Sequence, residues 1–92
     1  MFTGLITDVG EVVAKSGGHF TIATRYPAAS IPIGASISCD GVCLTATSIA
    51  ANPKGARFTV DVSNETISKT TLKNWETGRA VNLERATQQT RV

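Results

Sequence analysis

Short alternations of apolar and polar residues run through the chain, broken by turn-forming residues about every ten positions. The breaks fall at residues 16–18, 26–34, 40–41, 52–55 and 77–78. A period of two places successive side chains on opposite faces of an extended strand. The pattern therefore predicts strands over residues 5–13, 20–25, 35–39, 42–49, 57–62 and 80–84.

Composition agrees with an all-β chain, because the strand-favouring residues Val, Ile and Thr supply 28 of the 92 positions. Six short strands favour a small closed six-stranded barrel, since closure removes exposed strand edges. An open sandwich is the alternative. One short helix is expected before the last strand, where Ser63 or Asn64 can cap free N–H groups and Glu65 lies in the first turn.

The pair Asp40-Gly41 predicts a tight hairpin, because these residues suit the positive φ angles of a type I′ turn. Its register pairs Cys39 with Val42. One face then carries apolar residues that belong in a core, namely Ile37, Cys39, Val42 and Leu44. The other face carries small residues, namely Ser36, Ser38, Cys43 and Thr45. The two cysteines point to opposite sides, which disfavours a disulfide between them.

The small-residue face allows two interpretations. It is either a solvated outer surface or a platform on which a flat ring rests while hydroxyls bond its edge. Strand 57–62 likewise points Phe58, Val60 and Val62 inward and Asp61 outward, toward the polar run from Ser63 to Thr66. That run is either an ordinary capped helix or a site for a polyhydroxyl chain. The pattern alone favours the simpler interpretation in both cases.

Several functional classes fit poorly. Ninety-two residues make one domain. The net charge of +2 comes from nine basic residues, no two adjacent, which gives no footprint for nucleic acid. No run is apolar enough to span a membrane, and residues 1–11 do not resemble a signal peptide, so the expectation is cytoplasmic. Cys39, Cys43 and a lone His19, expected to be solvated in a turn, are too few for zinc.

Four segments in order nevertheless resemble one family. They are MFTGLI at the start, GASISCDGVCLT over residues 34–45, DVSNETI over 61–67 and VNLERA over 81–86. Across residues 1–86 they are similar to the N-terminal barrel of riboflavin synthase. The resemblance implies a chain of two six-stranded Greek-key barrels that forms a homotrimer. It also implies conversion of two molecules of 6,7-dimethyl-8-ribityllumazine to riboflavin and 5-amino-6-ribitylaminouracil, without cofactor or metal, between barrels of adjacent subunits.

Carried over by motif, the resemblance implies site residues in three groups. The ring-binding positions are Gly4, Leu5, Ile6, Cys43, Leu44 and Thr45. The ribityl-binding positions are Asp61, Val62, Ser63, Asn64, Glu65 and Thr66. The positions tied to catalysis are Phe2, Ser36, Cys43, Thr45 and Asn82. Considered without the resemblance, Phe2 is a strand-end anchor or a lid, and Asn82 and Glu84 are residues that can simply face solvent.

The second barrel expected of the family is absent from this sequence. Residues 1–86 are expected to form the barrel, and residues 87–92 a tail that begins the missing linker. The chain is then a truncated form or a naturally single barrel. We expect it to bind a ribityl pteridine or flavin with little or no turnover, and to form a homodimer in which a second copy takes the place of the missing barrel. A non-catalytic flavin- or lumazine-binding protein is the alternative. An oligonucleotide-binding barrel fits poorly, since the few aromatic residues are scattered and core-like.

Overall fold

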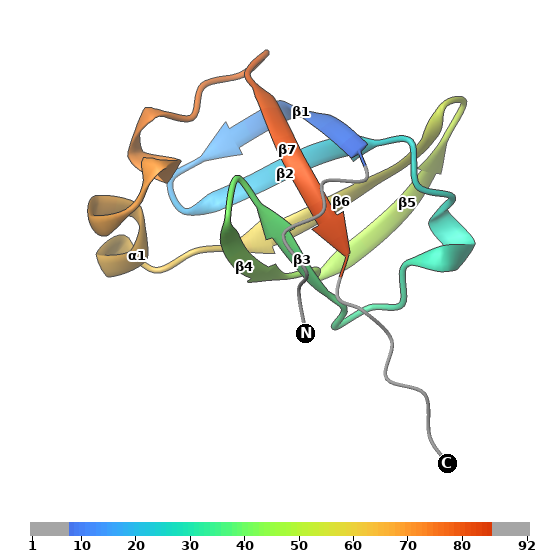
Figure 1. Ribbon diagram of the computed structural model, residues 1–92, viewed down its shortest axis with the longest axis horizontal. Helices are drawn as coiled ribbons and strands as arrows, with labels where there is room; N and C mark the ends of the chain where they lie inside the picture. Colours follow the sequence, from blue (N-terminus) through green and yellow to red (C-terminus); the bar gives the residue numbers. More distant parts are fainter. Residues whose placement is uncertain (1–7, 86–92) are drawn as a thin grey trace.

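The computed structural model describes residues 8–85, and in this part the fold is all-β, as predicted (Figure 1). The strands are β1 Asp8–Ser16, β2 His19–Thr24, β3 Ser36–Cys39, β4 Val42–Thr45, β5 Ser48–Asn52, β6 Gly55–Asp61 and β7 Ala80–Arg85. The helical segments are the 3₁₀ turn η1 Ala28–Ser30, the α-helix α1 Asn64–Lys69 and the 3₁₀ turn η2 Thr71–Asn74. The predicted short helix before the last strand is therefore confirmed.

The strands form one sheet of seven in the order β4-β3-β7-β1-β2-β6-β5, with every neighbouring pair antiparallel. The sheet curls into a half-barrel, so that β4 contacts β6 although the two are far apart in the strand order (Figure 1). Among the described residues, β4 and β5 remain the two ends of the sheet. The predicted closure into a barrel is thus not part of the pairing in residues 8–85.

The predicted count of six strands is wrong, because the range 42–49 contains two strands rather than one. The backbone changes partners between them. Ala46 donates its N–H to the carbonyl of Ala35, whereas Thr47 donates to the carbonyl of Thr59 on β6. The chain therefore leaves the neighbourhood of β3 and joins β6 within one residue. Ala46, buried at the break, continues the apolar alternation of Val42 and Leu44, but beyond it Ser48 is exposed and Ile49 is half-buried, so the alternation changes phase where β5 begins.

The interior of the curled sheet holds one core. Its largest fully buried side chains are Trp75, Phe20, Phe58, Ile22, Ile37, Leu72 and Leu83. The rings of Phe20 and Trp75 meet edge to face, with centroids 5.4 Å apart and an interplanar angle of 79°, a favourable geometry for aromatic pairs. Phe58, Val60 and Val62 all point inward, as the alternation predicts. Their burial orients the polar residues between them, Thr59 and Asp61, outward.

The turn between β1 and β2 packs against the end of β6. Val62 donates its N–H to the carbonyl of Gly18 over 2.8 Å. A Cβ atom on Gly18 would lie 2.2 Å from the Val62 carbonyl oxygen, so only glycine fits this approach. The contact holds the β1–β2 turn beside the segment that enters α1.

Helix α1 begins as the sequence predicts. Ser63 is the N-cap, and its Oγ accepts a hydrogen bond from the N–H of Thr66 over 3.2 Å. Glu65 in the first turn pairs with Lys69 at 3.2 Å one turn later. None of the helical segments within residues 8–85 has the length and apolar character that crossing a membrane requires.

Candidate functional site

The predicted hairpin register is confirmed. β3 and β4 pair Ser36 with Thr45, Ile37 with Leu44, Ser38 with Cys43 and Cys39 with Val42. The turn residues have positive φ, 52° at Asp40 and 85° at Gly41, as a type I′ turn requires. Ile37, Cys39 and Leu44 are buried and Val42 is half-buried. Ser36, Cys43 and Thr45 are exposed together on the opposite face, which we call the hairpin shelf.

Two residues expected on the exposed side are buried instead. Ser38 is 8% exposed and Glu84 is 7% exposed. The reason is that β3 is not an edge strand: Ser38 lies between Cys43 of β4 and Glu84 of β7 in one cross-strand row. Neighbours on both sides cover the middle of such a row. The sequence pattern gives the face of a residue but not the number of strands beside it.

The hairpin tip is anchored to β7 at Asn82. Asp40 donates its N–H to the Asn82 carbonyl over 2.8 Å, and the Asp40 carboxylate accepts the Asn82 N–H, also over 2.8 Å. The carboxylate also faces Arg79 at 3.7 Å. The Asn82 side chain is exposed. Asp40 therefore holds the hairpin tip to β7, whereas the sequence indicated it only as a turn former.

The polar run that follows β6 lies near the hairpin shelf, because β4 and β6 contact each other. Asp61, Ser63, Asn64 and Glu65 are exposed, and Thr66 is half-buried. Val62 and Leu44 point into the core, so these two predicted site residues can offer a ligand only their backbone. The two predicted halves of the site therefore lie on or next to two strands that contact each other, although these are far apart in the strand order.

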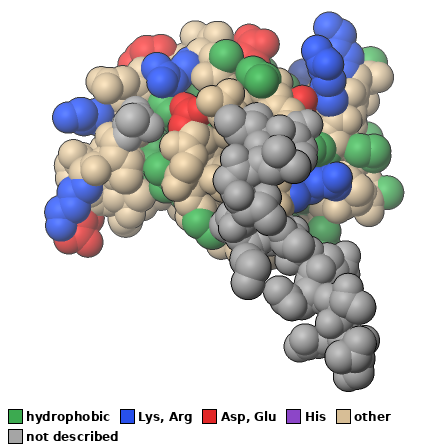
Figure 2. All heavy atoms as spheres, viewed as in Figure 1, with side chains coloured by type: hydrophobic (Ala, Val, Ile, Leu, Met, Phe, Trp, Pro, Cys, Tyr) green, Lys and Arg blue, Asp and Glu red, His purple; other side chains and the backbone are tan. Residues whose placement is uncertain are grey.

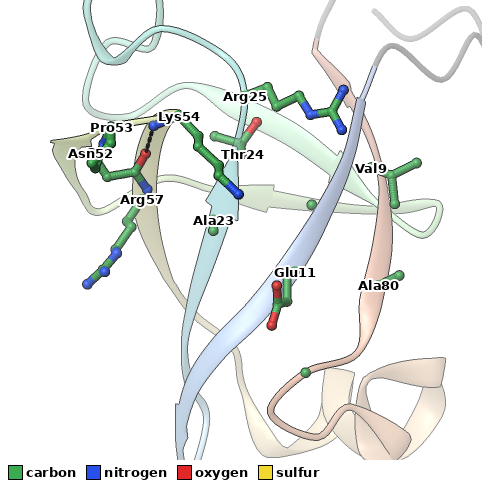
Figure 3. A pocket seen from close by; sticks show the side chains of 12 residues that line it. Val9, Glu11, Ala23, Thr24, Arg25, Asn52, Pro53, Lys54, Arg57 and Ala80 are labelled. Carbon is green, nitrogen blue, oxygen red and sulfur yellow. Dashed lines mark hydrogen bonds between the residues drawn. The ribbon is translucent and has the colours of Figure 1, made fainter.

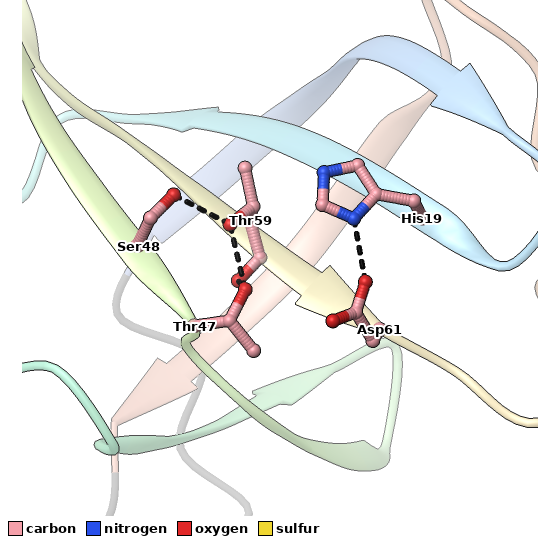
Figure 4. A network of polar contacts seen from close by, with 5 residues as sticks. All are labelled: His19, Thr47, Ser48, Thr59 and Asp61. Atoms are coloured by element: carbon pink, nitrogen blue, oxygen red, sulfur yellow. Dashed lines mark hydrogen bonds and ion pairs between the residues drawn. The ribbon is translucent and has the colours of Figure 1, made fainter.

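His19 has a partner that the sequence did not reveal. Its Nδ1 lies 2.5 Å from Oδ1 of Asp61, and the two residues are opposite each other in the β2–β6 register (Figure 4). The His19 side chain is 51% exposed, as expected of a solvated histidine, but the residue begins β2 instead of lying in the turn, and it contacts a predicted ribityl-binding carboxylate. The signal is invisible in the sequence because the partners are 42 positions apart.

Three hydroxyls lie on the same side of β6, nearer its middle. Thr59 Oγ1 is 2.7 Å from Thr47 Oγ1 and 2.6 Å from Ser48 Oγ (Figure 4). Thr47 also donates to the Thr59 carbonyl at 3.1 Å. These contacts hold the start of β5 to β6 at the point where the chain leaves β4.

The two cysteines differ in chemistry as well as in exposure. Both are free thiols. Burial, and then the negative charges of Asp40 and Cys43, raise the pKa of Cys39 to about 12, so its thiolate does not form at neutral pH. Cys43 is exposed on the hairpin shelf, where a thiol can meet a ligand. The expected division between a core cysteine and a surface cysteine is confirmed.

A distinct hollow of about 450 Å³ lies at the other end of β6, beside the β5–β6 turn (Figure 3). Its lining residues include Val9, Glu11, Ala23, Arg25, Lys54, Arg57 and Ala80. The Lys54 side chain extends across the hollow, whereas that of Arg57 points away from it (Figure 3). None of the described residues that we predicted for the site lines this hollow. This hollow and the predicted site residues therefore lie at different places on the fold.

The distribution of surface charge does not point to a different site. Lys and Arg side chains occur at several separate places on the face seen in Figure 2.

Four of the predicted site residues, Phe2, Gly4, Leu5 and Ile6, lie outside the described residues, so their placement stays a prediction.

Fold and site together define a small antiparallel β domain with a polar shelf beside a strand-to-helix junction. The sequence matches the lumazine binding domain over residues 3–86. It is 42% identical over 91 residues to the riboflavin synthase of Brucella abortus (strain 2308), covering 94% of this chain and 45% of that protein. It is 40% identical over 90 residues to the riboflavin synthase of Bacillus subtilis (strain 168), covering 94% of this chain and 40% of that protein. The riboflavin synthase of Saccharomyces cerevisiae is 37% identical over 100 residues, covering 97% of this chain and 40% of that protein.

The chain belongs to the lumazine-binding domain family, which confirms the resemblance to riboflavin synthase found in the sequence motifs. It spans less than half the length of these curated relatives.

Proposed function

We propose that this chain binds 6,7-dimethyl-8-ribityllumazine and riboflavin on the hairpin shelf, as one half of a riboflavin synthase active site. The observation that carries the proposal is the β3–β4 register, which exposes Ser36, Cys43 and Thr45 on one face. That face lies beside the end of β6, where the hydrogen-bonding side chains from Asp61 to Glu65 are also exposed. A flat ring fits small side chains, and a ribityl chain fits a run of hydrogen-bonding groups.

The chemistry of the shelf fits a reaction governed by positioning. Two hydroxyls and one thiol supply donors and acceptors but no strong base, and a half-site of this kind holds one substrate. The relatives named as riboflavin synthases are about twice as long, so a second half-site has room in them. Holding two substrates face to face turns a bimolecular encounter into an effectively intramolecular one. We therefore expect this chain to bind ligand with little or no turnover.

Binding is tested by titrating riboflavin with the chain and following the quenching of flavin fluorescence. The variant Thr45→Val removes one shelf hydroxyl with little change in shape and should weaken binding about three- to tenfold, the value of one hydrogen bond. Thr77→Val is the matched control, because Thr77 is exposed outside the proposed site. Equal affinity of the wild type and Thr45→Val, or no quenching at all, would contradict the proposal.

The second candidate function, a flavin or lumazine carrier, is separated from the first by one incubation. The chain is mixed with 6,7-dimethyl-8-ribityllumazine, and riboflavin is measured by its absorbance. Riboflavin formation supports the synthase half-site, and tight binding without product supports the carrier. The exposed single shelf, with no second site on the described residues facing it, is the observation that keeps the carrier in consideration.

The assembly and the finer fold are also proposals. We infer that two copies of this chain place their shelves face to face as a homodimer, and that full-length relatives form homotrimers. Light scattering with and without riboflavin tests the dimer, and a monomer under both conditions at high concentration would refute it.

We further infer that residues 1–86 form the closed Greek-key barrel of the family, that residues 87–92 begin a linker, and that the protein acts in the cytoplasm without cofactor or metal.

A further inference from the structure

We propose that His19 is a positioning residue for the ligand: it holds the carboxylate of Asp61 in the orientation that accepts a hydroxyl of the ligand's polyhydroxyl chain. The proposal rests on the proposed function, because it assigns Asp61 to that chain. His19 lies outside every motif that carries the family resemblance. Only the folded chain brings the two side chains together.

The geometry defines how the pair works. Nδ1 of His19 lies 2.5 Å from Oδ1 of Asp61, a hydrogen bond in which the carboxylate oxygen accepts when the ring carries its proton on Nδ1. Within residues 8–85, the other carboxylate oxygen, Oδ2, has no hydrogen-bond partner. One oxygen of Asp61 is thus committed to the protein, and the other is available to a ligand hydroxyl. The remaining ring nitrogen of His19 points away from Asp61 (Figure 4).

The backbone under the pair is held on both sides. His19 and Asp61 face each other as partners of the antiparallel β2–β6 ladder. One residue further along each strand end, the Val62 N–H bonds the Gly18 carbonyl at 2.8 Å. The two Cα atoms are therefore fixed, and the remaining freedom is the rotation of the two side chains. The hydrogen bond removes that rotation before the ligand arrives, which lowers the entropy lost on binding.

A structural role accounts poorly for the pair. The His19 side chain is 51% exposed and the Asp61 side chain 66% exposed, and ion pairs so open to water add little to stability. The backbone ladder that runs from the pair of His19 and Asp61 to that of Thr24 and Ala56 already joins β2 to β6. Removing the imidazole should therefore leave the fold intact while freeing the carboxylate.

The test compares riboflavin with lumiflavin, which has the same ring system but no ribityl chain, by fluorescence quenching on the complete chain. His19→Ala should weaken riboflavin binding about three- to tenfold and leave lumiflavin binding within twofold of the wild type. His19→Asn should restore riboflavin binding, because its amide nitrogen takes the place of Nδ1. His19→Gln should not, because its longer side chain carries the amide past that position. Glu76→Ala is the matched control, since it removes another exposed ion pair, with Lys15.

Each outcome decides the matter. Unchanged or tighter riboflavin binding by His19→Ala overturns the proposal. So does an equal loss for lumiflavin, or the same behaviour of the Asn and Gln variants. Melting curves of all variants check folding, and if His19→Ala does not fold, the Asn–Gln comparison still decides. Failure of the wild type to bind riboflavin would instead refute the proposed function, whereas a binding wild type with an indifferent His19 refutes only this inference.

Discussion

The close approach of Gly18 to Val62 can be tested by the substitution Gly18→Ala, which adds one methyl group. Gly18→Ala places a Cβ 2.2 Å from the Val62 carbonyl oxygen, well inside van der Waals contact, and the obstacle is backbone rather than a flexible side chain. The β1–β2 turn and the end of β6 must separate, which breaks the hydrogen bond from Val62 to Gly18. Overpacking costs about 1–3 kcal/mol, and the lost hydrogen bond about 0.5–1.5 kcal/mol. The expected loss in the free energy of unfolding is therefore about 2–4 kcal/mol.

Thermal or urea denaturation measures this loss directly. For a domain of this size each kcal/mol shifts Tm by about 4–8 °C, so Gly18→Ala should melt at least about 8 °C below the wild type. Gly17→Ala is the matched control. Gly17 has φ of +59° and open space around a Cβ, so its only cost is the left-handed backbone, about 1 kcal/mol.

Equal melting temperatures for the two alanine variants would refute the reasoning, because they would show that the turn does not press against β6. The same two variants also test the proposed binding site. Separating the turn from β6 also separates His19 from Asp61, so Gly18→Ala should weaken riboflavin binding and Gly17→Ala should not.

Three further predictions concern residues around the hairpin shelf. Cys39→Ser should lower the free energy of unfolding by about 1–3 kcal/mol, because it buries a hydroxyl without a good partner. Cys43→Ser should stay within about 0.5 kcal/mol of the wild type. Equal losses for the two variants in urea denaturation would contradict the observed register. Native protein should react with a thiol reagent once per chain, at Cys43, and twice after unfolding. Because the pKa of Cys39 is raised from 9.0 to about 12, the contribution of the Cys39 thiol to the free energy of unfolding should be complete below pH 9 and lost between pH 9 and 12. A Cys39→Ala variant whose stability falls with pH as steeply as that of the wild type over this range would argue against this. Ser63→Ala should cost about 1 kcal/mol of stability and Ser63→Gly only a few tenths, and indistinguishable melting curves for the two would show that the Ser63 cap does not stabilise α1.

Much of the architecture follows from local rules. Alternation assigned Phe58, Val60 and Val62 to the core, and Asp40-Gly41 specified both the turn and the register of β3 with β4. These predictions succeeded because a two-residue turn leaves no freedom in pairing its own strands. The motifs were equally informative about the family, since their order along the chain carries the resemblance without any coordinates.

Other features depend on strands that are distant in the chain. The division of residues 42–49 into β4 and β5 arises where backbone hydrogen bonds pass from Ala35 to Thr59. The alternation changes phase there, because Ala46 is buried whereas Ser48 is exposed and Ile49 is half-buried, but a change of phase does not say which strand the chain joins next. Ser38 and Glu84 are buried because β7 pairs with β3, a neighbour that no local pattern announces.

The sequence by itself determined the hairpin, its two faces, the capped helix and the family. Each of these depends either on residues close together in the chain or on the order of motifs along it. Only the tertiary structure decided that β4 meets β6, that Gly18 supports Val62 and that His19 holds Asp61. The physical reason is that sheet curvature and long-range pairing set which surfaces meet, and a period-two pattern states the face of a side chain without stating what lies opposite it.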